Sequence, residues 1–309
     1  MGVERFMKHT IAATAALTMA VFLVQQQAHS ESLVIPPIAA KQAGATSLFK
    51  QQIRIEGTTF WQDKWMPIDL KLASQNQCQY GQLAADGTMP IKIVPEKVAA
   101  SIRIGRALMS PSPRIAPIVA SMDSNGIFAV PTDGKKDILQ SSFTTAVAWL
   151  YNLHPTGRVN LGDKSEMTQM LPMETGQLMR MSITLVASEI QETPNEKAIR
   201  FQVYGTGALV NQEARSTNQG YRSADSSLSG YLLVGLSSGE VVSEKLLHTM
   251  TSTKSDLGES MDNALQLSWE CTRIKRGTPS ATKPRPQAAP DSWTIINAAS
   301  GLMRLRPSS

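Results

Sequence analysis

The sequence predicts a mainly β protein, either an antiparallel sandwich or an open half-barrel, with one helix, a proline-rich linker and a short C-terminal helix. Between residues 48 and 276, runs of alternating apolar and polar residues are separated by turn residues about every 8 to 14 positions. These runs do not alternate with helices, as they would in a parallel sheet. The chain of 309 residues is 42% hydrophobic, which suffices for a core and excludes wholesale disorder.

The N-terminus is typical of a secretory signal peptide. A basic start precedes an apolar stretch of 14 residues at 11–24, and the Ala-His-Ser sequence at 28–30 provides small residues for a cleavage site. This stretch is short for a membrane span, which needs about 20 residues, although an uncleaved anchor stays open. We expect cleavage after Ser30 and a periplasmic location. Residues 31–46 are expected to form a leader without an element of its own.

Residues 47–276 form the predicted antiparallel β domain. Residues 137–151 have apolar side chains near a 3.6-residue period, which predicts a helix, although their branched residues leave a strand open. The other runs predict strands and hairpins: strands over 47–57, 66–77, 92–104 and 115–120, a hairpin of 179–190 with 198–210, a hairpin of 228–236 with 240–251, and a last strand over 264–274.

The two cysteines, Cys78 and Cys271, are predicted to form a disulfide. Export would place them in an oxidising compartment, where two thiols in one domain most simply pair. No histidine lies close to either in sequence, which argues against a reactive thiol. The small number of cysteines also excludes a cysteine-rich zinc or iron–sulfur site.

The C-terminal region changes in character after Arg276. Residues 277–290 contain four prolines and predict an extended linker. Residues 291–309 form a basic segment with a candidate apolar helix, and from Arg273 onward the chain carries seven basic residues and one acidic residue. This segment could dock on its own domain, on a partner or on anionic lipid. Its candidate partner-binding residues are Trp293, Ile296, Leu302, Arg304 and Arg306.

Two segments resemble those of exported bacterial β-rich families of unknown function. Residues 153–163 (LHPTGRVNLGD) are similar to a step that precedes a strand in those families, and residues 229–243 (SGYLLVGLSSGEVVS) are similar to one of their hairpins. The resemblance covers about 150–275. It implies a shape similar to the half-barrels of periplasmic lipoprotein carriers. The shared motifs are turn residues and bear on the fold rather than on a function.

No convergent catalytic set is found, so we expect a protein that is not an enzyme and has no cofactor. Residues 235–239 match the G-x-S-x-G pattern of serine hydrolases, but a strand follows where that chemistry needs a helix. We interpret this match as a hairpin turn. After cleavage only His154 and His248 remain, too few for a histidine-based metal site, and we expect both to be packed residues. Export also makes nucleic acid an unsuitable partner.

A methionine-rich segment provides the other candidate site. Met167, Met170 and Met173 recur every third residue, and Met179 and Met181 follow. Thioethers select Cu(I) or Ag(I), and methionine also lines irregular apolar grooves that receive flexible ligands. Plain packing is the third interpretation.

These observations favour a non-enzymatic periplasmic binding or assembly factor whose sheet takes an apolar ligand, such as a lipid or a lipoprotein acyl chain. The alternative is a cell-envelope structural or protein-interaction module without a ligand cavity. A further alternative is Cu(I) or Ag(I) binding by the methionine segment. The expected partners are an apolar ligand or an envelope protein, with membrane contact through 291–309 as another candidate.

Overall fold

The computed structural model describes residues 32–38, 42–61, 64–111, 113–123, 128–129, 139–140, 143–144, 147, 151–172, 178–210, 220–256 and 259–276. The predicted signal peptide 1–30, linker 277–290 and C-terminal segment 291–309 lie outside these residues. Among the described residues, no helix has both the length and the apolar character that crossing a membrane requires.

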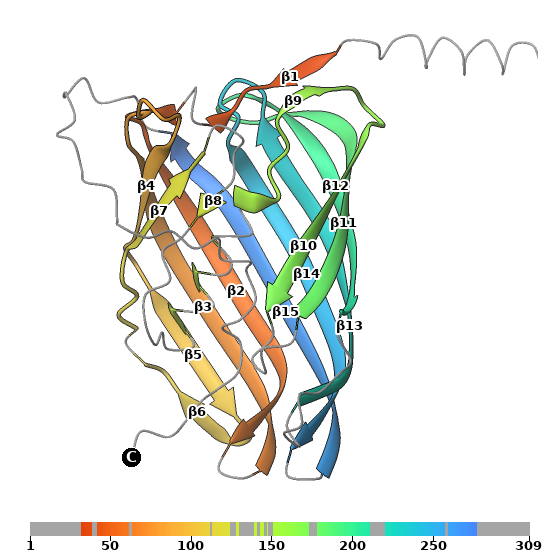
Figure 1. Ribbon diagram of the computed structural model, residues 1–309. Coiled ribbons are helices and arrows are strands. Elements are labelled where there is room, and N and C mark those ends of the chain that lie inside the picture. Colours follow the sequence, from red (N-terminus) through yellow and green to blue (C-terminus); the bar gives the residue numbers. More distant parts are fainter. Residues whose placement is uncertain are drawn as a thin grey trace, which may run out of the picture.

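Thirteen of the described strands form one antiparallel sheet, which confirms the predicted fold class (Figure 1). Its order is β10-β11-β12-β13-β14-β15-β2-β3-β4-β7-β8, with β5 beside β3 and β6 beside β5. In the described chain the end strands β10 and β8 do not pair with each other, so the sheet is open rather than a closed barrel. Its strands are β2 (Thr46–Trp61), β3 (Lys64–Tyr80), β4 (Met89–Pro95), β5 (Ala99–Ile104), β6 (Ala107–Met109), β7 (Ile118–Met122), β8 (Phe128–Ala129), β10 (Lys164–Pro172), β11 (Leu178–Glu192), β12 (Lys197–Leu209), β13 (Gly220–Gly235), β14 (Val241–Asp256) and β15 (Glu259–Arg276).

The predicted hairpins are confirmed in their positions. Strand β11 pairs with β12 around the turn at 193–196, and β13 pairs with β14 around 236–240. The run over 92–104 is divided by a bend after Pro95 into β4 and β5, and both pair with β3, one along its end and the other along its middle. Beyond Pro95, the backbone N–H of Glu96 donates to the carbonyl oxygen of Gln75 at 2.7 Å, and the N–H of Gln75 donates to the carbonyl oxygen of Lys97 at 3.3 Å, so the bend stays hydrogen-bonded to β3.

Alternation along the strands separates two faces. On β15 every second residue from Asn263 to Arg273 is buried, and the residues between them are exposed or half-buried. The other long strands show the same pattern, so we call the buried side the inner face and the other side the outer face. We call the end of the sheet where β2 begins and β15 ends the upper end, which lies at the top of Figure 1.

The prediction that 31–46 contains no element is wrong at its start. Residues Leu33–Ile35 form strand β1, which pairs antiparallel with β9 (Gly157–Val159) in a second, two-stranded sheet at the upper end (Figure 1). Ile35 and Ile38 are buried in the main core. The Pro-Pro sequence between them suggested a leader, but the flanking apolar residues pack well enough to fix the backbone.

The described residues of the predicted helix over 137–151 are helical. Leu139, Phe143, Val147 and Tyr151 are buried in the same core as the inner face of the sheet. The hydroxyl of Thr144 donates to the carbonyl oxygen of Gln140 at 2.8 Å, the bond to residue i−4 that a helical threonine can make. The branched residues are therefore accommodated by a helix.

The predicted disulfide between Cys78 and Cys271 is wrong: both thiols are free and buried. Strand β3 carries Cys78 and strand β15 carries Cys271, and the two strands lie on opposite sides of β2. Two strand spacings amount to about 9.5 Å, whereas a disulfide joins Cα atoms less than about 7 Å apart. In addition, Cys78 pairs with Ser47 and Cys271 pairs with Gln51, four positions further along β2.

We predict that both cysteines stay reduced and protected. Burial raises the pKa of Cys78 to about 12, and it raises the pKa of Cys271 as well, so neither thiol forms the reactive thiolate near neutral pH. Protein purified without reductant should therefore release two titratable thiols after denaturation and almost none while folded. Fewer than two thiols in the denatured, unreduced protein would contradict the register of β3, β2 and β15.

Candidate functional site: the inner face of the sheet

The inner face divides along the strands into an ionic upper part, a polar belt and an apolar lower part. At the upper end, Arg273 donates to Glu240 Oε2 at 2.8 Å and also to Glu196 Oε1, and all three side chains are at most 3% exposed. Arg273 lies near the end of β15. Glu196 lies in the turn that connects β11 to β12, and Glu240 lies in the turn that connects β13 to β14. The ion pairs therefore hold the ends of two hairpins to the middle of the sheet.

Hydrogen bonds from the turn at 236–239 complete the surroundings of Glu196. Its carboxylate accepts the backbone N–H and the hydroxyl of Ser237 and those of Ser238, at 2.6 to 3.0 Å. Although burial opposes it, these bonds and Arg273 lower the pKa of Glu196 to about 2. Residues 235–239 are thus a hairpin turn, as predicted, and its serines bind a structural carboxylate.

We call the ion pairs of Arg273 with Glu196 and Glu240, and the groups hydrogen-bonded to them, the upper network. A second branch of this network leads to the helical segment. Glu240 accepts hydrogen bonds from Ser47, at 3.0 Å, and from the hydroxyl of Tyr80. The hydroxyls of Tyr80 and Tyr151 lie 3.1 Å apart, and that of Tyr151 lies 2.8 Å from the sulfur of Cys78. Tyr151 also stacks on Phe128, with ring centroids 4.6 Å apart. The upper network therefore connects three strands and the segment that packs on them.

Below the ionic network a row of polar residues crosses the inner face. Glu244, Cys271, Gln51 and Ser74 are direct neighbours on β14, β15, β2 and β3, and each is at most 4% exposed. Asn76, the next inward residue on β3, donates to Gln51 Oε1 at 2.8 Å. We call these five residues the polar belt.

Glu244 is the chemically distinctive member of the polar belt. Trp269 donates its indole N–H to Oε1 of Glu244. No described cation pairs with this carboxyl. Burial raises the pKa of Glu244 to about 8, and the hydrogen bond from Trp269, which lowers the pKa, offsets only part of that rise. At neutral pH the group is therefore mostly a neutral carboxylic acid.

Methionine side chains line the lower part of the inner face. They come from four strands, and Met179 and Met181 are fully buried where β12 has Gly207 instead of a side chain. The hydroxyl of Ser226 donates to both of their sulfurs, at 3.3 and 2.9 Å. We call the set the methionine-lined part: Met66, Met167, Met179, Met181 and Met250.

The predicted copper set Met167, Met170 and Met173 is placed only in part. Met167 is half-buried on β10 opposite Ile183, an inner-face residue, whereas position 170 pairs with Arg180, a residue of the outer face. Residues three apart on one strand belong to opposite faces, so this spacing does not gather ligands in a strand. Met173 lies outside the described residues, as do Trp293, Ile296, Leu302, Arg304 and Arg306. The described residues contain no cluster of histidine, cysteine and carboxylate side chains that could hold a metal ion.

The two histidines lie apart from each other, as packed residues. His248 is on the inner face of β14 opposite Leu267, and His154 follows the helical segment. Burial lowers the pKa of both imidazoles to about 4, so both are neutral at physiological pH.

Sequence reasoning missed the site roles of Glu196, Glu240, Glu244 and Arg273, four ionisable residues of the inner face. For Glu244 the sequence did contain a signal. Glu244 lies on the same side of its strand as Leu246, His248 and Met250, so the alternation predicts an inward, buried carboxyl. For Glu196 and Glu240 no local pattern distinguishes a buried turn carboxylate from an exposed one.

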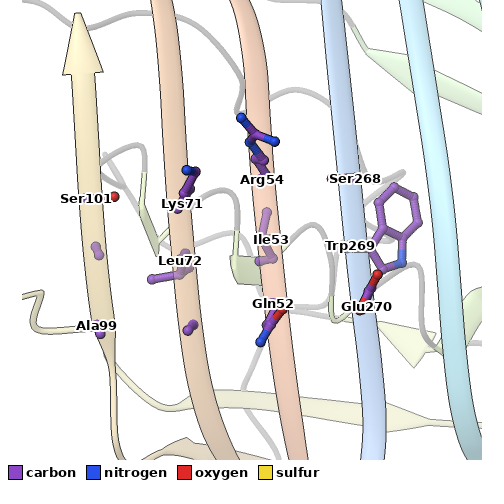
Figure 2. A pocket seen from close by; sticks show the side chains of 12 residues that line it. Gln52, Ile53, Arg54, Lys71, Leu72, Ala99, Ser101, Ser268, Trp269 and Glu270 are labelled. Carbon is purple, nitrogen blue, oxygen red and sulfur yellow. The ribbon is translucent and has the colours of Figure 1, made fainter.

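A separate hollow of about 510 Å³ lies on the outer face, over β5, β3, β2 and β15 (Figure 2). Its floor carries small side chains, including Ala73, Ala99 and Ser268. The charged residues around it already have opposite charges beside them: Arg54 pairs with Glu56 and Asp69, Lys71 with Asp69, and Glu270 with Lys245. Exposed pairs of this kind contribute little energy and give the hollow no evident selectivity for a ligand.

No family model matches the chain, and no curated protein matches it. Among solved structures it is similar to one described as lipid–protein interactions in lipovitellin, with 11% identity and a TM-score of 0.46 over 86% of this chain and 28% of that one. It thus spans less than a third of that structure's length. A protein from Bacteroides fragilis that is described as exported and as having a YmcC-like fold shows 13% identity and a TM-score of 0.21, with 80% of this chain and 100% of that one covered. OpdQ from Pseudomonas aeruginosa shows 8% identity and a TM-score of 0.17, with 76% and 100% covered. These likenesses concern the fold alone.

Proposed function

We propose that this chain is an exported, non-enzymatic binding protein that carries an apolar ligand on the inner face of its sheet. The observation that carries the proposal is the methionine-lined part, where five methionines from four strands line one end of a large apolar surface. Methionine is unbranched and flexible, and such surfaces adapt to apolar ligands without a fixed shape. Export rests on the sequence of the first thirty residues.

The composition of the inner face supports a ligand rather than a catalytic role. Its lower part is apolar with a few polar groups, among them Ser226 and His248, which is the usual composition of sites for small apolar molecules. Most of the ionisable residues above it are engaged with one another in the upper network.

We expect a charge placed in the methionine-lined part to weaken ligand binding. Met167 is half-buried on an end strand of the sheet, so Met167→Lys should fold while bringing an ammonium group next to the ligand. The affinity for Nile red, a neutral apolar dye, should fall by at least about tenfold. Thr168→Lys is the matched control, because it adds the same charge one residue later on the outer face.

Native mass spectrometry of the full chain purified from its envelope fraction tests the same proposal without a variant. We expect a co-purifying apolar molecule that organic extraction removes. If no lipid co-purifies and Nile red does not bind the extracted protein, the proposal is wrong. The inner face is then an ordinary core, as the alternative of a structural or interaction module requires.

A further inference from the structure

Two oxygens of the polar belt are buried without a hydrogen bond from the described part of the chain. They are Oε2 of Glu244 and Oδ1 of Asn76, on side chains that are 1% and 4% exposed. A buried oxygen without a partner is destabilising, and most buried polar groups in folded proteins bind a protein group, water or a ligand. Both oxygens lie on the face to which the proposed function assigns the ligand.

The polar belt lies at one boundary of the apolar lower part of the inner face. Toward the lower end, the next inward residues on the same strands are Leu246, Trp269, Ile53 and Leu72, all buried. A molecule lying along the strands there would have its apolar part on the methionine-lined part and one end at the belt. That arrangement suits an amphiphile, whose polar end needs partners that a purely apolar surface lacks.

We propose that the polar belt binds the uncharged headgroup of an amphiphile, such as the hydroxyl and ester groups of a monoacylglycerol, while its acyl chain lies along the methionine-lined part. This inference rests on the proposed function. Glu244, through its free Oε2, is the principal contact, and Asn76 is the second.

The charges near the belt select an uncharged headgroup. The nearest described cation on the inner face, Arg273, is already held by Glu196 and Glu240, so a carboxylate or phosphate would meet carboxyl groups without a free positive partner. An ammonium headgroup would have to ionise Glu244, whose pKa of about 8 shows that its surroundings favour the neutral form. A neutral carboxylic acid both donates and accepts, which matches hydroxyl and ester groups.

The dimensions of the inner face suit one acyl chain. From Glu244 to Met250 is six residues along β14, or about 20 Å. The hydrocarbon core of a bilayer is about 30 Å thick and holds two opposed chains, so a single chain spans about 15 Å. Glu244 is three strand spacings, about 14 Å, from its register neighbour Ser74, and Asn76 lies two residues, about 7 Å, further along β3. The Cα atoms of Glu244 and Asn76 are therefore about 16 Å apart, so a headgroup with several polar atoms suits them better than a single hydroxyl.

The test uses the full chain after organic extraction and measures displacement of bound Nile red near neutral pH. Monoolein, oleic acid and oleylamine share one chain length and differ in headgroup. We expect monoolein to bind at least about tenfold more tightly than the other two, a difference of about 1.4 kcal/mol. If oleic acid or oleylamine binds as tightly as monoolein, the headgroup inference is overturned while the apolar-ligand function stands.

Variants assign the effect to Glu244. Glu244→Leu should weaken monoolein binding by at least about tenfold while changing Nile red affinity less than about twofold. Glu270→Leu is the matched control on the outer face of the neighbouring strand, and it should change neither. Equal loss of both ligands in Glu244→Leu would show a structural role and overturn the inference. Should that variant not fold, the ligand series on the unaltered chain still decides the headgroup inference. Failure of every ligand, including Nile red, would refute the proposed function itself.

Discussion

Replacing Arg273 with methionine should lower the free energy of unfolding by about 3 to 5 kcal/mol. The arginine is completely buried between Glu196 and Glu240, and methionine fills similar volume without the charge. Two buried carboxylates would then lack their cation, and removing one partner of a buried ion pair costs more than the pair contributes. Urea unfolding followed by circular dichroism measures the change.

Arg54→Met is the matched control for that prediction. Arg54 also pairs with two carboxylates, Glu56 and Asp69, but its side chain is 44% exposed. Exposed pairs contribute little to stability because solvent screens their charges, so this variant should unfold almost as the native chain does. Adding Glu240→Gln to Arg273→Met should recover part of the loss, because it removes one uncompensated charge. Equal costs for the two arginine variants would show that the upper network contributes little to stability.

The native chain should lose stability as the pH becomes alkaline, and replacing Glu244 with glutamine should remove that loss of unfolding free energy. Burial raises the pKa of Glu244 from its ordinary value of 4.5 to about 8, so the folded state holds this proton more tightly than the unfolded state. The resulting stability is fully present below pH 4.5 and is lost as the pH rises through about 8. The variant cannot ionise here, so between pH about 5 and about 9 it should gain on the order of 4 kcal/mol relative to the native chain.

The other groups near Glu244 should leave this difference intact. Cys271 lies directly across the ladder, and burial raises its pKa well above the ordinary range, so it stays neutral in the same interval. Burial lowers the pKa of His154 and His248 to about 4, so their contribution is present above about 6.5 and is lost as the pH falls through about 4. This acid loss is common to both proteins. Parallel pH profiles for the native chain and Glu244→Gln, measured by urea unfolding, would show that the carboxyl is not held neutral.

Local sequence patterns were sufficient for the class of the fold and for most of its strands. The alternation on β15 and on the two late hairpins assigns an inner and an outer face, because side chains on a strand point alternately to the two sides. The turn residues at 193–196 and 236–239 separate strands that then pair with their neighbours in sequence. The described residues within 137–151 are helical, as the apolar period of that segment predicted.

Long-range packing settled the features that carry the proposed site. Whether Cys78 and Cys271 can bond depends on β2 lying between their strands, and Leu33–Ile35 becomes a strand only because Gly157–Val159 lies beside it. The charge state of Glu244 depends on burial among apolar residues and on Trp269. The burial of Glu196 and Glu240 depends on Arg273, more than 30 residues away in the chain. Periodicity assigns a residue to a face, but the energy of a buried charge depends on neighbours that only strand order and register bring together.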